Sequence, residues 1–378
     1  MRQTKLIMSN FGLYIHVPFC ASRCVYCGFY STTRSQLMRC YVDAVCAEMR
    51  LRSGYLKGTL RTVYLGGGTP SQLPAELLQL LFSNIEDVYG RPQGEVTIEC
   101  NPDDVTEAYA RQLALLPINR VSMGVQTFSN SRLRFLHRRH TAQEARHAVT
   151  ILREAGIGNI SIDLMFGFPG ETMAEWESDI NEALALNVEH ISAYSLMYEE
   201  GTPLYKMLND GRVSEIDEQL SNDMYDRLCD LLTEGGYEHY EISNFAKPGF
   251  RSRHNSSYWH QIPYIGLGAA AHSFDIRSRQ WNVANVDDYI MSIGKGIVPM
   301  EREQLSDSTR YDDLITTALR TSEGIDVDAV AEPYRSYMLR MSAPYISRGL
   351  LTLSEGRLAL SRQGIKVSDM VMADMMYV

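Results

Sequence analysis

Short apolar runs alternate with longer amphipathic stretches along the first half of the chain. The apolar runs, rich in β-branched residues, occupy positions 13–17, 61–65, 96–100, 120–124, 160–166 and 190–196. Each is followed by a segment with helical periodicity, as in residues 36–51 and in the segment that starts near residue 74. Six strand–helix units in succession predict a parallel sheet with crossover helices, which is an α/β fold.

The pattern changes near residue 301. Residues 306–321 and 327–347 have helical periodicity, and the methionine-rich segment 370–376 predicts a final helix that packs on the core. Between them, residues 350–353 and 357–360 predict a short hairpin around Glu355-Gly356. We therefore expect residues 1–300 to form one large domain, with an extension at about 240–300, and residues 301–378 to form a small α+β, winged-helix-like domain.

Composition and charge argue against several classes of protein. The chain has 378 residues, 45% of them hydrophobic and 22% charged, with a formal net charge of −10. This acidic balance argues against a nucleic-acid partner. No apolar stretch is long enough to span a bilayer, and residues 1–10 lack the apolar core of a signal peptide. Because four further cysteines are scattered, we expect free thiols in a reducing compartment: a cytoplasmic protein, or one peripheral to the inner membrane face.

Three cysteines at the end of the first apolar run are the main chemical signal. Cys20, Cys24 and Cys27 have the spacing C-x3-C-x2-C on one short loop. Such a loop can hold three corners of a cubic iron–sulfur cluster, whose usual complement is four thiolates. No obvious fourth ligand follows, so one iron would keep an open site. A tetrahedral zinc site, which normally takes four N or S ligands, and reduced structural cysteines are the alternatives.

Polar residues recur near the ends of the predicted strands, where ligands of parallel α/β folds collect. They are the Gly66–Gly68 run with Thr69 and Pro70, and then Glu99, Asn101, Gln126, Asp163 and Tyr194. Taken singly, each has an ordinary role in a turn or a cap. Their shared edge predicts a binding site.

These motifs together resemble the radical S-adenosylmethionine (SAM) superfamily, and within it the oxygen-independent coproporphyrinogen III oxidase branch. They are Tyr14-Ile-His-Val-Pro-Phe-Cys20, the cysteine loop, Gly66–Pro70 and Gly124-Val-Gln126-Thr-Phe128. The resemblance implies a partial (β/α)6 barrel. It also implies a [4Fe–4S] cluster on Cys20, Cys24 and Cys27, whose fourth iron chelates SAM. In this superfamily one electron from the cluster cleaves SAM to methionine and a 5′-deoxyadenosyl radical.

The resemblance further implies how SAM is held. Glycines at 67 and 68 would let the backbone approach its methionine end, since no side chain blocks the way. Tyr26 would contact the adenine. The SAM-binding set implied in this way is Tyr14, Tyr26, Gly67, Gly68, Thr69, Glu99, Gln126, Arg138 and Asp163.

Two departures from the oxidase pattern favour a different subgroup of the branch. The oxidases carry a further cysteine where this chain has Phe29, and a longer arm than the thirteen residues that precede Tyr14 here. Both features resemble the HemW-type heme chaperones, which are marked by a His-Asn-x-x-Tyr-Trp motif. This chain matches the motif with His254, Asn255, Tyr258 and Trp259. A histidine can ligate heme iron, and aromatic rings can pack on the macrocycle.

The resemblance thus implies a heme chaperone that binds a [4Fe–4S] cluster, SAM and heme, with His254 on the heme iron and Asn255, Tyr258 and Trp259 beside it. Its partners would be an electron donor and heme acceptor proteins, with respiratory hemoproteins as one candidate class. The alternative is an enzyme, either a coproporphyrinogen dehydrogenase-type oxidoreductase that decarboxylates coproporphyrinogen III, or a radical SAM enzyme acting on another tetrapyrrole. The heme acceptor, the electron donor, SAM cleavage and the oligomeric state are left open.

Overall fold

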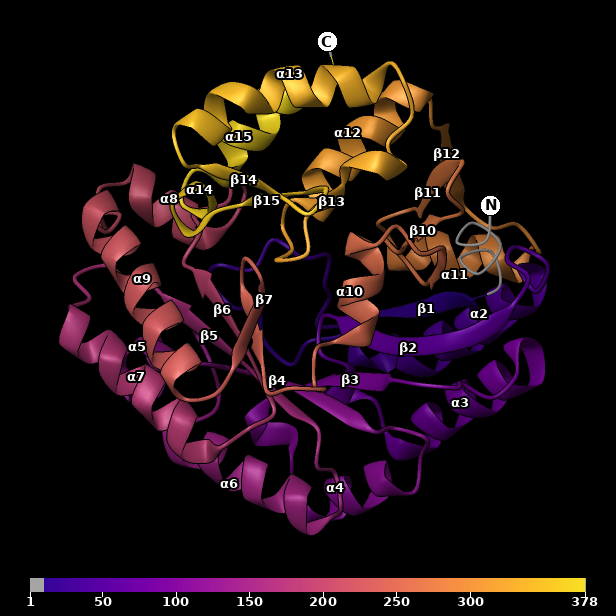
Figure 1. Cartoon of the computed structure of the whole chain (residues 1–378). Coiled ribbons are helices and arrows are strands. Elements are labelled where there is room, and N and C mark those ends of the chain that lie inside the picture. The colour runs from indigo at the N-terminus through magenta and orange to yellow at the C-terminus, as the bar shows by residue number, and fades with distance from the viewer. Residues whose placement is uncertain (1–9, 378) are drawn as a thin grey trace.

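The computed structural model describes residues 10–377, and it confirms a partial parallel barrel with an appended small domain (Figure 1). Residues 1–9, which include most of the segment tested as a signal peptide, lie outside the described residues. Six parallel strands stand side by side in chain order: β1 (Asn10–Val17), β2 (Thr59–Gly67), β3 (Val96–Cys100), β4 (Arg120–Gln126), β5 (Ile160–Phe166) and β6 (His190–Ser195).

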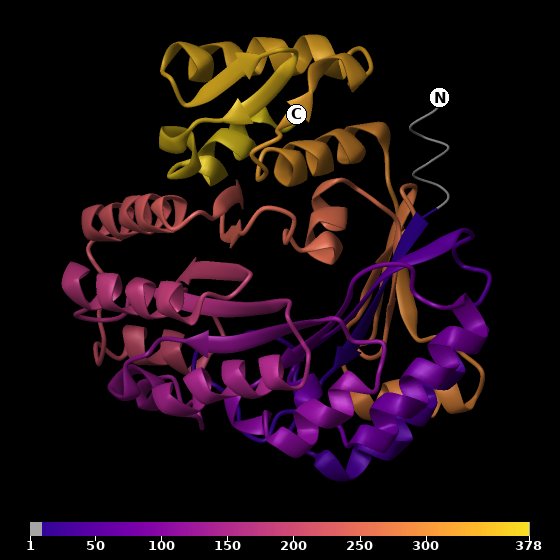
Figure 2. The same ribbon diagram turned by 60° about the horizontal axis from the view of Figure 1, so that its bottom comes forward.

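Helices between the strands lie on the outside of the curved sheet (Figures 1 and 2). They are α2 (Met38–Leu51), α3 (Ala75–Tyr89), α4 (Glu107–Ala114), α5 (Asn130–Phe135), α6 (Ala142–Glu154) and α7 (Met173–Leu186), followed by α8 (Pro203–Asn209) and α9 (Glu218–Glu234). Thr141 and Thr172 start α6 and α7 with capping boxes, which satisfy the free N–H groups of the first turn. The apolar faces of the helices pack on strand residues such as Leu13 and Ile15, both fully buried.

The sheet is longer than the sequence pattern predicted. Its twelve strands follow the order β12-β11-β10-β9-β1-β2-β3-β4-β5-β6-β8-β7, so the barrel stays open. The added elements are β7 (Glu238–Glu241), β8 (Asn244–Ala246), α10 (Arg253–Trp259), β9 (Tyr264–Leu267), β10 (His272–Phe274), β11 (Ser278–Asn282), α11 (Val286–Gly294) and β12 (Met300–Gln304). Strand β12 is exposed along its whole length, so it lacks the apolar alternation that would have revealed it.

The C-terminal unit forms a separate layer above the barrel (Figure 2). It contains α12 (Asp307–Ala318), β13 (Ile325–Asp326), α13 (Tyr334–Ser347), β14 (Leu351–Ser354), β15 (Arg357–Leu360), α14 (Arg362–Ile365) and α15 (Ser368–Met375), and it has its own hydrophobic cluster. The predicted hairpin is confirmed as β14–β15. The continuous helix predicted over 327–347 is wrong: residues 327–329 form a 3-10 turn and α13 begins after Pro333, because proline disfavours helical backbone in the preceding residue.

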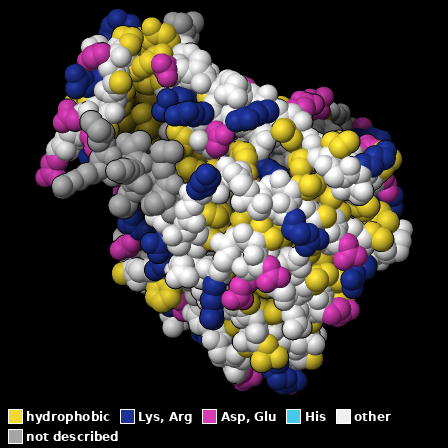
Figure 3. Space-filling view, turned by 90° about the vertical axis from the view of Figure 1, so that its right-hand side faces the viewer, with side chains coloured by type: hydrophobic (Ala, Val, Ile, Leu, Met, Phe, Trp, Pro, Cys, Tyr) yellow, Lys and Arg dark blue, Asp and Glu magenta, His cyan; other side chains and the backbone are white. Residues whose placement is uncertain are grey.

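Charged side chains connect the sheet extension to this unit. Arg279 on β11 pairs with Glu303 on β12 at 3.3 Å and with Asp313 on α12 at 3.1 Å. On the adjoining face of the molecule, Lys and Arg side chains are interspersed with Asp and Glu (Figure 3). Within residues 10–377, no helix combines the length and apolar character needed to cross a bilayer.

Candidate functional site

A single cavity of about 650 Å³ occupies the interior of the barrel. The cysteine loop and the glycine run contribute to its wall, together with side chains from β2 to β6 and from α10. Among its lining residues are Cys20, Cys24, Tyr26, Cys27, Gly67, Gly68, Thr69, Glu99, Asn101, Gln126, Arg138, Asp163, Tyr194 and Asn255. Thus most of the residues that the sequence singles out share one cavity, although they span more than 230 positions of the chain.

The cysteine loop is fixed at both ends by backbone contacts. Cys20 N donates to Thr32 O at 2.9 Å, and Thr32 N donates back to Pro18 O at 2.7 Å. This pairing closes the loop after β1, so the three thiols are held at the rim of the cavity. Phe29, in place of the fourth cysteine of the oxidases, is 73% exposed and lines the same rim.

Two of the thiol sulfurs accept hydrogen bonds. Thr69 Oγ1 donates to Cys20 Sγ and Arg138 Nη1 donates to Cys24 Sγ, each at 3.5 Å. Burial, and next the neighbouring thiols, raise the pKa of Cys27; burial likewise raises the pKa of Cys20. A positive centre such as a metal cluster would therefore stabilise the thiolates of Cys20 and Cys27.

The three thiols suit an iron–sulfur cluster, which takes cysteine thiolates as its ligands. Residues 10–377 contain no group of three His, Cys, Asp or Glu side chains that could hold one metal ion. Ligands of a tetrahedral zinc need sulfur atoms about 3.8 Å apart, from Zn–S bonds of about 2.3 Å. The three thiols all line one cavity, and a tetrahedral zinc site would need a fourth ligand beside them.

Two partly buried carboxylates, Glu99 on β3 and Asp163 on β5, line the cavity. Tyr64 Oη and Gly67 N donate to Glu99 at 2.8 and 3.0 Å. Burial is the main cause that raises the pKa of Glu99 to about 7 and that of Asp163 to about 6. A cationic ligand lowers the cost of ionising both groups, and SAM carries an ammonium and a sulfonium.

The glycine run has a structural reason as well as the implied ligand role. A Cβ on Gly68 would lie 2.7 Å from the backbone carbon of Pro18, and one on Gly67, where φ is +114°, would lie 2.5 Å from the His16 ring. These glycines let β2 pass close to the cysteine loop. A bulky residue at 68 would thus displace the loop itself.

Gln126 and Arg138 complete the wall at the carboxyl end of β4. Gln126 adopts a left-handed backbone with φ of 69°, which is uncommon for a residue with a side chain. Arg138 Nη2 donates to Asn101 Oδ1 at 2.7 Å and to Gly124 O at 2.6 Å. Its Nε is buried without a partner among the described residues, so the guanidinium retains a donor for a further molecule.

Tyr14 is not brought to the cavity wall with the others. Its hydroxyl hydrogen-bonds with His16 Nδ1 at 3.0 Å, and its ring stacks near Tyr64 with centroids 6.2 Å apart. Its role in SAM binding stays a prediction.

The His-Asn-x-x-Tyr-Trp motif forms α10, and His254 is only 1% exposed. Its Nδ1 hydrogen-bonds with Thr62 Oγ1 and its Nε2 with Tyr258 Oη, both at 2.8 Å. The ring also stacks on Tyr64, with centroids 5.1 Å apart. In this geometry neither nitrogen is available to heme iron. Ligation by His254 stays a prediction that requires one of these bonds to open.

The other members of the motif point in different directions. Asn255 lines the cavity. Trp259 lies under the Arg320 guanidinium, which is 5.0 Å from its ring centroid, and Tyr258 packs edge-on against Tyr264 at 4.7 Å. The motif therefore joins three regions: the cavity, the barrel wall and the C-terminal unit.

Sequence reasoning missed several residues that shape the site. Glu95 accepts hydrogen bonds from Arg253 N at 2.9 Å and His254 N at 3.0 Å, and so anchors the start of α10. Arg120, Ser122 and Ser192 line the cavity as well. Arg120 begins a strand, where a charged residue is ordinarily read as a solvated end; only its burial reveals it.

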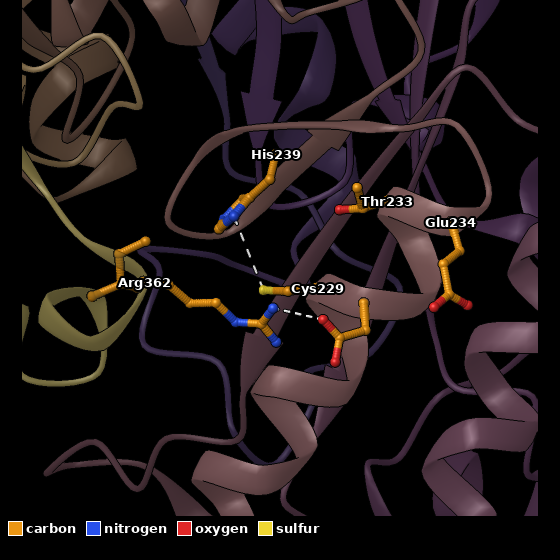
Figure 4. A pocket seen from close by; sticks show the side chains of 7 residues that line it. Cys229, Thr233, Glu234, His239 and Arg362 are labelled. Atoms are coloured by element: carbon orange, nitrogen blue, oxygen red, sulfur yellow. Dashed lines mark hydrogen bonds and ion pairs between the residues drawn. The ribbon is translucent and has the colours of Figure 1, made fainter.

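A second cavity, of about 360 Å³, lies between α9 and α14 (Figure 4). Cys229 Sγ and His239 Nδ1 face each other there at 4.0 Å. Arg362 beside them donates to Asp230 at 2.6 Å. The groups that line this cavity largely bond one another, and they connect α9 to the C-terminal unit.

Comparisons with known proteins show the family and the fold of this chain. The sequence profile of the radical SAM superfamily matches residues 14–183, and that of the HemN C-terminal domain matches residues 305–367. The heme chaperone HemW of Lactococcus lactis is 33% identical over 94% of this chain and 93% of its own, and that of Bacillus subtilis is 34% identical over 93% and 95%. The solved coproporphyrinogen III oxidase (HemN) of Escherichia coli, a radical SAM enzyme, has the same fold, with a TM-score of 0.84 at 19% identity over 100% of this chain and 93% of that one.

Proposed function

We propose a function on the premise that this chain belongs to the radical SAM superfamily and, within it, to the HemW heme chaperone family. The chain binds a [4Fe–4S] cluster, SAM and heme, and it transfers heme to acceptor proteins in the cytoplasm. The observation that carries the proposal is the shared cavity: Asn255, from the motif that marks the heme chaperones, opens onto the space lined by the three cysteines.

In this proposal, one set of residues holds the cluster and another set binds SAM. Cys20, Cys24 and Cys27 hold the cluster, which supplies one electron at a time when bound. Thr69 and Arg138 donate to the ligand sulfurs and so stabilise their negative charge. The remaining cavity residues bind and orient SAM; they are Tyr26, Gly67, Gly68, Glu99, Gln126 and Asp163.

Phe29 supports the chaperone over the oxidase. It stands at the rim of the cavity, where the oxidases have a further cysteine, and it cannot ligate or donate a proton. An exposed aromatic ring at that position instead offers an apolar surface to a flat macrocycle.

Heme transfer is the test of this function. The anaerobically reconstituted protein is loaded with heme and mixed with an apo-hemoprotein, and the Soret band of each partner is followed after rapid separation. We expect transfer to the acceptor. A parallel incubation with coproporphyrinogen III, SAM and reductant should yield no protoporphyrinogen. Decarboxylation without heme binding would establish the oxidase instead.

A further inference from the structure

Arg120 is a buried cation with two unpartnered nitrogens at the inner end of the cavity. It is 1% exposed and lines the cavity. Its Nε and Nη1 have no hydrogen-bond partner within residues 10–377, nor does the hydroxyl of Thr97, which faces it on β3. A buried guanidinium without acceptors is costly, so this end of the barrel is built to receive a ligand that accepts hydrogen bonds.

The position of Arg120 on β4 separates it from the cysteine loop. Arg120 is the first residue of β4 and Gln126 the last. At a rise of about 3.3 Å per residue, the two Cα atoms are about 20 Å apart along the strand. The cysteine loop and Arg138 lie toward the Gln126 end, as the Arg138 bond to Gly124 O shows. Arg120 therefore begins at the opposite end of β4 from the cysteine loop, although its charge reaches Glu99 and Asp163 and lowers the pKa of both.

Three polar side chains line this inner end beside Arg120. We call the set of Arg120, Ser122, Ser192 and Asn255 the inner subsite. Asn255 is held there by the anchoring of α10: Glu95 binds the first N–H groups of the helix, and His254 is locked between Thr62 and Tyr258. The motif thus presents its asparagine, rather than its histidine, to the cavity.

The charges around the subsite select the ligand. Burial, and next the charge of Arg120, lower the pKa of His254 to about 3 and that of His190 well below its ordinary value, so both imidazoles are neutral. Arg120 is then the cation of the inner subsite, and Glu99 and Asp163, which pair in register with Ser122 and Ser192, are carboxylates whose pKa its charge lowers. One guanidinium near two carboxylates suits a monoanion better than a doubly charged phosphate. Its planar fork matches a carboxylate, and the neighbouring hydroxyls and amide can complete the contacts.

We propose that the inner subsite binds a carboxylate, namely a propionate of a tetrapyrrole that extends past SAM into the barrel. The proposal rests on the proposed function, which places a tetrapyrrole on this protein. It adds the part of the molecule that recognises the tetrapyrrole's acid side chains.

The experiment measures binding of heme and of metal-free protoporphyrin IX, each as the free acid and as the dimethyl ester, to cluster-loaded protein with SAM present. In the native chain we expect the ester to bind about 10- to 100-fold more weakly than the acid, as loss of a charge-assisted hydrogen bond would give. Arg120→Gln should abolish this difference, and Arg120→Lys should restore part of it. Arg139→Gln, which removes a cation from the rim of the same cavity, should leave the difference in place.

The outcomes are distinct. An acid-to-ester difference that persists in Arg120→Gln, or its absence in the native chain, overturns the inner subsite while heme binding itself stands. Loss of SAM affinity in Arg120→Gln with an unchanged difference assigns Arg120 to SAM and also overturns it. Selective binding of the metal-free acid without heme binding refutes the heme chaperone and supports the subsite. The comparison of acid and ester in the native chain needs no variant, so misfolding of Arg120→Gln does not leave the question open.

Discussion

At the scale of single residues, the two raised carboxyl pKa values have opposite consequences for the protein with and without ligand. Glu99 titrates near pH 7 in the fold, against 4.5 as its ordinary value. Its folded-state pKa is higher, so the unfolded chain ionises first as the pH rises. The free-energy cost that ionised Glu99 imposes on folding grows from about pH 4.5 to about pH 7. Above pH 7 it reaches its full value, on the order of 3 kcal/mol.

We therefore predict that Glu99→Gln flattens the pH dependence of stability in the cofactor-free protein. The variant should gain free energy of unfolding relative to the native chain at pH 8 and show little gain at pH 5, because only the ionised carboxylate is penalised. Denaturant unfolding at both values measures this. Glu86→Gln, on the exposed side of α3, is the control. Equal effects at the two pH values would refute the buried titration.

SAM binding should depend on pH in the opposite sense. A cationic ligand favours the ionised carboxylates, so SAM affinity should fall as the pH drops from 8 to 5.5. Glu99→Gln should remove the part of this fall centred near pH 7, and Asp163→Asn the part near pH 6. Calorimetric titration of cluster-loaded protein across this range is the measurement. Affinity that is independent of pH in the native chain would remove both residues from the SAM site.

The cluster ligands give the sharpest prediction at this scale. Alanine at Cys20, Cys24 or Cys27 should abolish the charge-transfer absorption of the reconstituted cluster and leave the far-ultraviolet circular dichroism unchanged, since the loop lies outside the sheet. Cys40→Ala removes an exposed thiol from α2 and should keep the cluster. Loss of the cluster in Cys40→Ala together with its retention in Cys24→Ala would overturn the assignment.

At the scale of elements, the sequence predicted those strands that have a clear apolar pattern. Strands β3 and β5 were placed to the residue, because both are buried apolar runs between clear turns. Elements β7 to β12 were missed because most of them are short, and strands such as β11 and β12 are largely polar. The cavity was predictable as a shared strand edge. One of the two hydrogen bonds of the His254 ring, in contrast, is with Thr62, 192 positions earlier in the chain.

The role of His254 in α10 is the part of the motif that the sequence alone could not determine. His254→Gln should lower the free energy of unfolding by about 1–3 kcal/mol, since Thr62 or Tyr258 loses a buried partner. If His254 only anchors the helix, the heme Soret band keeps its position in this variant. Glu95→Gln weakens the same helix from its other side and serves as the comparison. A shifted Soret band in His254→Gln alone would show that α10 opens and that His254 ligates iron.

At the scale of the whole molecule, the C-terminal unit is attached to the barrel partly through charged groups on α9. Arg362 pairs with Asp226 and Asp230, and Lys366 also pairs with Asp226. On the other side, Trp259 of α10 lies beneath Arg320, which follows α12. The layer above the barrel thus touches the helix that carries Asn255, so movement of this layer and access to the inner end of the cavity are physically connected.

We predict that the double variant Arg362→Gln/Lys366→Gln loosens this layer without unfolding it. Its hydrophobic cluster is its own, so amide exchange should quicken in α9 and α14 while the core helices of the unit stay protected. High salt should reproduce the effect in the native chain, because these partly exposed pairs are screened. Arg335→Gln, which removes the ion pair with Glu332 at the start of α13, is the control. Faster heme release in the double variant, with an unchanged cluster spectrum, would show that the C-terminal layer regulates the cavity from its inner end. Unchanged exchange at α9 would show instead that apolar contacts alone hold the two layers together.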